Sequence, residues 1–300
     1  MNILKTIKLK LRRFNLLFFI FSILYLPVKL FSIDIYDFGM SLYKENDYYR
    51  AISEFERYIF YNKNNRNKKK VNNSYIYIVK SYYYAEQYNS AIKSGKRFAN
   101  YLKDPYFKNR LTFWLATSYL MNNNYNKALK LYLELTKKNI PEKIDEYSYY
   151  RLIWIDILQK KWNSAIKKLN NFEKKYPQSN LKNITSLMKI DIKKGINFSP
   201  LSPTVAAILS TILPGAGQVY TKRIGDGIVA FSLIAALTYG TYYYYQNGPQ
   251  EISISLGVLD IIFYIGNIYT AFGSAHKYNI NFNEKLSQDI FNNYFENYDF

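Results

Sequence analysis

The chain has 300 residues and a net charge of +19, from 41 Lys and Arg against 22 Asp and Glu. It has no cysteine and one histidine, His276, which excludes disulfides, cysteine nucleophiles and thiolate or histidine-rich metal sites. With 49% hydrophobic and 19% aromatic residues, the chain can bury a core and is not expected to be disordered. The basic excess indicates either an anionic partner or compositional drift in a chain rich in Lys, Asn, Ile and Tyr. We favour drift with a membrane contribution, and expect the run from Arg66 to Lys70 to be a solvated loop.

Residues 1–32 have the features of an export signal. Five Lys and Arg lie among the first 13 residues without an acid, and an apolar stretch from Phe14 to Leu26 follows. This order is typical of a secretory signal. Leu30 is large where cleavage prefers a small residue, so an uncleaved signal anchor is the alternative. Both readings place the following residues outside the cytoplasm, which argues against nucleic acid as the partner.

Residues 33–198 repeat an aromatic residue, two variable residues, alanine, and then isoleucine or leucine. The four alanines recur at intervals of 40, 37 and 37 residues: Ala51, Ala91, Ala128 and Ala165. A small residue lets two helices cross closely, and the surrounding hydrophobic residues recur at spacings of three and four. Each copy therefore predicts a pair of helices. Residues 179–194 are expected to add a capping helix that ends at Gly195.

The segment from 34 to 177 resembles tetratricopeptide repeats. The resemblance implies an all-α solenoid in which the first helix of each pair lines a groove that binds a peptide or protein. Each aromatic residue at a groove position either lines the groove or packs between helices, whereas the basic residues Lys80 and Arg110 are expected to line it. Aromatic residues with basic neighbours suit an extended or acidic segment of a partner. By position, the groove residues are Tyr36, Met40, Lys44, Lys80, Tyr84, Arg110, Phe113, Thr117, Tyr147, Tyr150 and Trp154.

Residues 199–276 are poor in charge and predict a bundle of two to three transmembrane helices. A crossing needs about 20 apolar residues, so the segments 227–245 and 252–275 qualify, while 204–220 either spans or re-enters the membrane. Lys222, Arg223 and Lys277 would lie inside and the loop at Glu251 outside if all three segments crossed and the repeats were exported. This agreement favours three crossings.

The string from Leu213 to Tyr220 resembles the Pro-Gly-x-Gly-Gln-x-Tyr signature of bacterial membrane modules related to the TM2 domain. The resemblance covers about 75 residues and implies a membrane location without a settled activity. Asp260 is a further candidate because an acid inside a membrane is costly. It either pairs with Lys222 or Arg223 or bonds to Asn267 or Gln218 across helices, or it is a neutral, hydrogen-bonded structural acid. The candidate residues of this module are Pro214, Gly215, Gly217, Gln218, Tyr220, Lys222, Arg223, Asp226, Gly227 and Asp260.

Residues 277–300 carry apolar residues at a spacing of four, which predicts an amphipathic helix that lies on the membrane or against a partner. The sequence as a whole predicts a non-enzymatic scaffold without a cofactor. Its repeats would bind a protein partner on the extracytoplasmic side of a bacterial inner membrane. The alternative is a component of membrane insertion, transport or envelope assembly that acts through residues 201–275. The sequence predicts no particular oligomeric state.

Overall fold

The computed structural model describes residues 34–62, 68–137 and 140–295. These residues form thirteen α-helices and no β-strand, which confirms the all-α prediction. The chain divides into two compact units between Asn122 and Asn123, inside the third predicted repeat, and each unit is described by itself. The predicted signal or anchor lies outside the described residues, and the predicted domain boundaries stay predictions.

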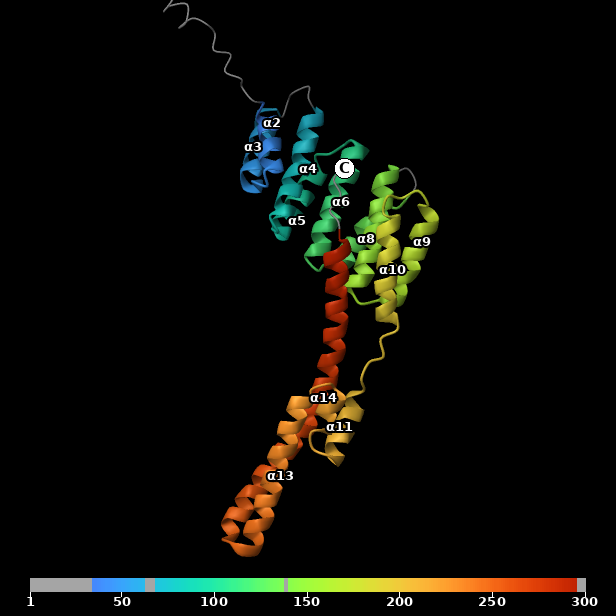
Figure 1. The fold of residues 1–300 in the computed structure, drawn as a ribbon. Helices are drawn as coiled ribbons and strands as arrows, with labels where there is room; N and C mark the ends of the chain where they lie inside the picture. Colours follow the sequence, from blue (N-terminus) through green and yellow to red (C-terminus); the bar gives the residue numbers. More distant parts are fainter. Residues whose placement is uncertain (1–33, 63–67, 138–139, 296–300) are drawn as a thin grey trace, which may run out of the picture. The chain divides into compact units, whose positions relative to one another are not determined.

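The first unit contains helices that pack against their neighbours along the chain (Figure 1). Ala51 and Ala91 are fully buried between these helices, as the repeat pattern predicts. Lys68 to Lys70 form the first turn of a helix, so the expected solvated loop is wrong for these three residues. The helices are α2 (Ile35–Lys44), α3 (Tyr48–Tyr61), α4 (Lys68–Tyr84), α5 (Tyr88–Ala99) and α6 (Pro105–Met121).

The second unit continues the repeats and then adds long apolar helices. Ala128 and Ala165 are again fully buried. A Cβ added to Gly195 would lie 2.6 Å from the Trp162 ring, which shows how closely the capping helix packs. The repeat helices are α7 (Tyr125–Glu134), α8 (Glu142–Leu158), α9 (Trp162–Lys175) and α10 (Lys182–Ile196), and the apolar ones are α11 (Pro203–Ile212), α12 (Ala216–Tyr220), α13 (Ile224–Asn247) and α14 (Gln250–Tyr294).

The turn within each repeat has one conformation. In every copy the repeated aromatic residue begins the second helix, and the residue two positions before it has a positive φ. In the first copy, the N–H of Asp47 donates to the carbonyl of Leu42 at 2.9 Å, which closes the end of the first helix. The residues in this left-handed conformation are Asn46 (63°), Glu86 (58°), Asn123 (57°) and Lys160 (58°).

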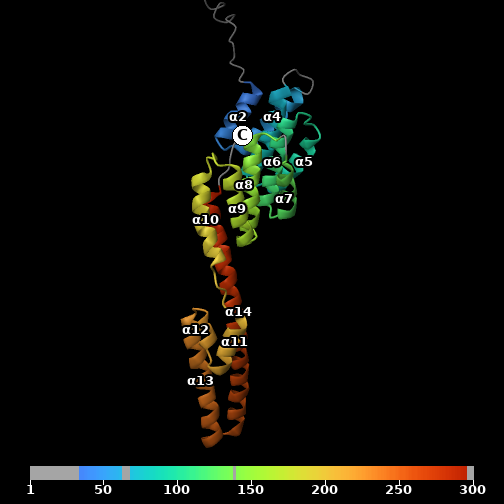
Figure 2. The same cartoon turned by 90° about the vertical axis from the view of Figure 1, so that its right-hand side faces the viewer.

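Helix α14 is a single helix of 45 residues and unites two segments that the sequence predicts separately. Its first half pairs with α13, and its last part, residues 283–294, lies beside α10 (Figure 2). We call residues 283–294 the tail segment. One continuous helix therefore joins the apolar hairpin of α13 and α14 to the repeats of the second unit.

Candidate binding face and apolar hairpin

Two basic residues predicted to line the groove are held inside the first unit. Lys80 is fully buried, and its Nζ lies 4.6 Å from the ring centroid of Tyr77 and 5.1 Å from those of Tyr43 and Trp114. Rings from three helices thus surround one ammonium group, an arrangement that stabilises the packing through cation–π attraction. Arg110 is 6% exposed and donates from Nη1 to Asn73 Oδ1 at 2.8 Å.

The other predicted groove residues of the first unit differ in accessibility. Phe113 and Thr117 are fully buried, and Tyr36 is nearly so. Tyr84 is half-buried and stacks on Tyr48 with ring centroids 5.7 Å apart. Lys44 is exposed. The accessible part of the predicted face in this unit is therefore formed by Lys44 and the half-buried Met40 and Tyr84.

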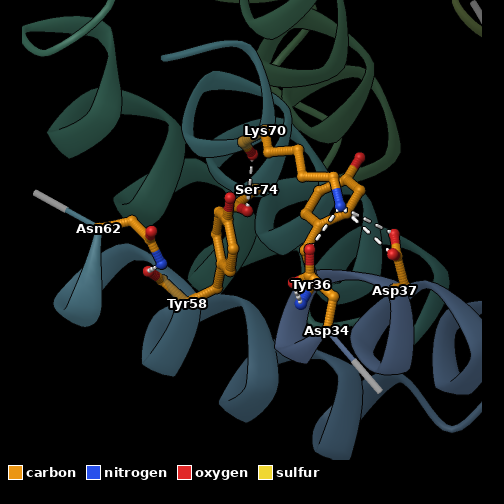
Figure 3. Close-up of polar contacts among 7 residues, drawn as sticks. All are labelled: Asp34, Tyr36, Asp37, Tyr58, Asn62, Lys70 and Ser74. Atoms are coloured by element: carbon orange, nitrogen blue, oxygen red, sulfur yellow. Dashed lines mark hydrogen bonds and ion pairs between the residues drawn. The ribbon is translucent and has the colours of Figure 1, made fainter. Parts of the chain in front are cut away.

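Figure 3 shows an ion-pair cluster that the sequence did not predict. Lys70 Nζ lies 2.6 Å from Asp34 Oδ2 and 3.2 Å from Asp37 Oδ1, and it sits 5.0 Å from the ring centroid of Tyr36. The hydrogen bond from Lys70 lowers the pKa of Asp34, and burial raises the pKa of Tyr36 to about 12. The cluster ties the first turn of α2 to the first turn of α4. A basic run read only for its charge does not reveal it.

In the second unit, the predicted groove holds the chain's own tail segment. Tyr150 and Trp154 are fully buried. The Tyr150 hydroxyl donates to the carbonyl of Tyr294 at 2.9 Å, and the Trp154 and Phe291 ring centroids are 5.8 Å apart. Tyr147, at the start of the same face, stays half-buried.

Further polar bonds fix the tail segment along its length. Trp162 Nε1 donates to Asn283 Oδ1 at 2.8 Å, and the Tyr294 hydroxyl donates to Asp191 Oδ2 at 2.8 Å. Between these two ends, Ile290 is fully buried. The sequence predicted that this amphipathic helix would lie on a membrane or on a partner, and here it lies on the repeats of its own chain.

The Pro-Gly motif forms a tight turn between α11 and α12. Gly215 has a φ of 86°, and a Cβ there would lie 2.1 Å from the carbonyl oxygen of Gly227. A Cβ on Gly217 would lie 2.1 Å from the carbonyl oxygen of Ala206. Both positions therefore require glycine. Pro214 immediately precedes this turn.

A buried polar network holds the turn against α14. Gln218 is 3% exposed; its Nε2 donates to Asn267 Oδ1 at 3.0 Å, and its Oε1 accepts from Ser210 Oγ at 3.0 Å. Asn267 Oδ1 also accepts from the N–H of Gly215 at 3.1 Å. The hydroxyl of Tyr220 accepts from the N–H of Ser202 at 3.2 Å. The motif residues thus hold the turn in place through buried hydrogen bonds.

The segment 204–220 enters and leaves beside the middle of α14, at the end of the apolar hairpin away from Gly248. Asn279 Oδ1 accepts from the N–H of Leu201 at 2.9 Å, the turn bonds to Asn267, and Arg223 Nη1 then donates to Ser274 Oγ at 2.7 Å. Helix α11 has 10 residues, a length of about 15 Å, against about 30 Å for a hydrocarbon core. The expectation that this segment crosses is wrong, because the chain reverses within it.

The basic residues of the module lie at that same end. Arg223 Nε pairs with Asp226 Oδ2 at 2.5 Å, and Lys222 Nζ lies 5.4 Å from the ring centroid of Tyr278. The tail segment continues from this end onto the repeats. One end of the apolar hairpin therefore carries Lys222, Arg223 and the repeats of the second unit. Three crossings would place the tail segment on the side of the membrane opposite these repeats, and the contacts exclude that arrangement.

Two helices are long and apolar enough to cross a membrane. They are α13 and α14, and only 11% of the most apolar 18 residues of each is buried. The core helix of a soluble protein would be mostly buried. The low burial supports contact with a bilayer, with the turn at Gly248 and Pro249 at the far end.

Asp260 has a different partner from those that the sequence predicted. Its Oδ2 accepts from Thr238 Oγ1 of α13 at 2.7 Å, whereas Gln218 and Asn267 bond to each other. Its Oδ1 is buried and has no hydrogen-bond partner among the described residues. Thr238 lies ten residues before Gly248 and Asp260 lies eleven residues after Pro249, so an antiparallel register about this turn could have identified Thr238.

The comparison with protein families supports the repeat assignment. The tetratricopeptide repeat model matches residues 147–179, which lie in α8, α9 and the turn that follows. Together with the helical hairpins, this match supports a tetratricopeptide repeat protein. A search of curated proteins found no match. Within the described ranges, no three His, Asp or Glu side chains gather as metal ligands would.

Proposed function

We propose that this protein is a membrane-tethered scaffold that binds a protein partner through its helical repeats. The observation that carries the proposal is α14, which extends from an apolar hairpin with little buried surface into the repeat array without a break. Repeats of this kind are typically non-enzymatic interaction modules, and the proposed role needs no cofactor. The accessible predicted face around Lys44 would contact the partner, because the tail segment fills the corresponding face at Trp154.

The proposed location is the extracytoplasmic side of a bacterial inner membrane. The basic and apolar order of residues 1–32 supports export of the repeats, and the first apolar segment usually dominates orientation. Lys222, Arg223 and Lys277 would then face the same side as the repeats, against the usual distribution of basic residues. With a hairpin in place of three crossings, the N-terminal segment and the basic residues of the module predict opposite orientations. We infer the orientation from the N-terminal segment.

The absence of cysteine makes single-cysteine labelling a direct test of the tether. Ser186→Cys, Gln288→Cys and Gln246→Cys place exposed thiols on α10, on the tail segment and at the hairpin tip. In spheroplasts, an impermeant maleimide is expected to label the first two variants, and the third only after lysis. Labelling of the first two from opposite sides would refute the hairpin. Labelling of Gln246→Cys alone would keep the hairpin and place the repeats in the cytoplasm.

Single cysteines in the otherwise cysteine-free chain also test partner binding. A photoreactive maleimide attached to Lys44→Cys is expected to crosslink one defined protein in intact membranes. The matched control is Lys174→Cys, an exposed position in the last turn of α9. Equal crosslinking at both positions would contradict a binding face at Lys44.

The alternative function, an insertion, transport or assembly component, is favoured by a cavity of about 570 Å³ in the apolar hairpin that Asp260 lines. Asp260→Leu in the full chain separates the two, since a scaffold that binds through its repeats would keep the Lys44→Cys crosslink. The isolated segment 201–300 is unsuitable for this test, because it would expose Leu286 and Ile290, which are buried here.

A further inference from the structure

A pocket opens in the apolar hairpin between α13, α14 and the Pro-Gly turn. Its volume is about 570 Å³. Phe231 and Tyr242 on its wall are 47% and 63% exposed, so the pocket is accessible from the surface that would contact lipid. Its wall includes Phe231, Thr238, Tyr242, Asp260 and Tyr264.

The acid in this pocket is only half satisfied. Thr238 donates to Asp260 Oδ2, and the buried Oδ1 has no hydrogen-bond partner among the described residues. The Tyr264 hydroxyl donates instead to the carbonyl of Thr211. A carboxyl oxygen away from water is unfavourable without a donor, and in a membrane it pairs with another polar group.

The acid lies too deep for the bilayer surface to supply that donor. Asp260 is ten residues after Gln250, the first residue of α14, which corresponds to about 15 Å of helix. A hydrocarbon core is about 30 Å thick, so Asp260 is near its middle. The donor must therefore belong to a membrane-embedded molecule.

The apolar hairpin, as the structure describes it, has no cation at this depth. Residues 224–275 contain no Lys, Arg or His, so a second copy of the hairpin would bring none either. Arg223 pairs with Asp226 and bonds to Ser274 at the opposite end of the hairpin. Neither the described residues of the hairpin nor a second copy of it therefore supplies a cationic donor to Asp260.

We propose that the Asp260 pocket docks a membrane-spanning helix of another protein that carries Lys or Arg at its middle. A cation in the pocket would both bond to the Asp260 carboxyl group and neutralise it, whereas Thr238 supplies only a neutral bond. The apolar wall formed by Phe231 and Tyr242 accommodates the stem of such a side chain. This partner is separate from the one proposed for the repeats.

The test measures binding of synthetic spanning peptides to the full chain in phosphatidylcholine vesicles by energy transfer. One polyleucine peptide has a central Lys, a second has a central Asn and a third has only Leu. The Lys peptide is expected to bind about ten-fold more tightly than the Leu peptide. Asp260→Asn should remove this preference and leave the weaker binding of the Leu peptide unchanged. The control Asp226→Asn, an acid at the other end of the hairpin, should preserve it.

Several outcomes would overturn the proposal. Equal binding of the Lys and Leu peptides would do so, as would a preference that survives in Asp260→Asn. Equal binding of the Asn and Lys peptides would show that the pocket requires a neutral hydrogen-bond donor and not a cation. Self-association that requires Asp260 would make a second copy the occupant. Labelling of Gln246→Cys in the Asp260→Asn background checks that the hairpin still forms.

Discussion

The docking of the tail segment makes a quantitative prediction for Ile290→Ala. Ile290 is fully buried against the repeats, and truncation of a buried isoleucine costs about 2–5 kcal/mol. The polar bonds of Trp162 to Asn283 and of Tyr294 to Asp191 flank the site and remain available. We therefore expect a loss of about 3 kcal/mol, which increases the undocked population about 100-fold.

Hydrogen exchange of backbone amides in residues 284–294 measures this change. Repeat arrays are stabilised by contacts between neighbours, so protection in α2–α6 should not change. The matched control is Asp289→Ala, because Asp289 precedes Ile290 and is exposed. Equal exchange in the two variants would refute the inference that Ile290 fixes the tail on the repeats.

Two pairs of substitutions test the turns. Glu86→Gly should raise the free energy of unfolding by about 1 kcal/mol in a urea titration, because its φ of 58° is unfavourable for a residue with a Cβ. Asn123→Gly should raise the free energy of unfolding by less, since asparagine tolerates this conformation. An equal increase in both variants would argue against backbone strain as the cause. Gly217→Ala should destabilise the hairpin by about 3 kcal/mol in detergent unfolding, because its Cβ would meet the carbonyl of Ala206. Gly266→Ala, with no atom within 4 Å of the added Cβ, should be nearly neutral, and an equal loss in both variants would contradict the packing argument.

The repeats were predictable because their signal is local. A buried alanine and a preceding aromatic residue fall within one helical turn, and the period repeats along the chain. The left-handed turn was not predictable at Glu86 or Lys160, since neither residue type favours a positive φ. There, tertiary packing of the two helices overrides the local preference.

The burial of the predicted groove residues could not be predicted from their positions in the repeat. A position on the first helix of a pair indicates which way a side chain points, but not what covers it. Lys80 is enclosed by rings from Tyr43, Tyr77 and Trp114, which lie on three different helices. Tyr150 and Trp154 are covered by a segment more than 100 residues away in the chain. Amphipathic spacing predicts an apolar face in each case and does not specify its partner.

Because α14 is one continuous helix, the number of membrane crossings and the orientation of the hairpin depend on different residues. The number of crossings between the repeats and the tail segment is fixed by contacts, because Tyr294 bonds to Tyr150 and α14 is continuous with the hairpin. With the proposed membrane tether, the number of crossings is therefore even, whatever the charges are. The basic residues at Lys222, Arg223 and Lys277 then indicate only which side that shared end occupies. The distribution of basic residues favoured three crossings only because the same residues were used to infer both the number of crossings and the orientation.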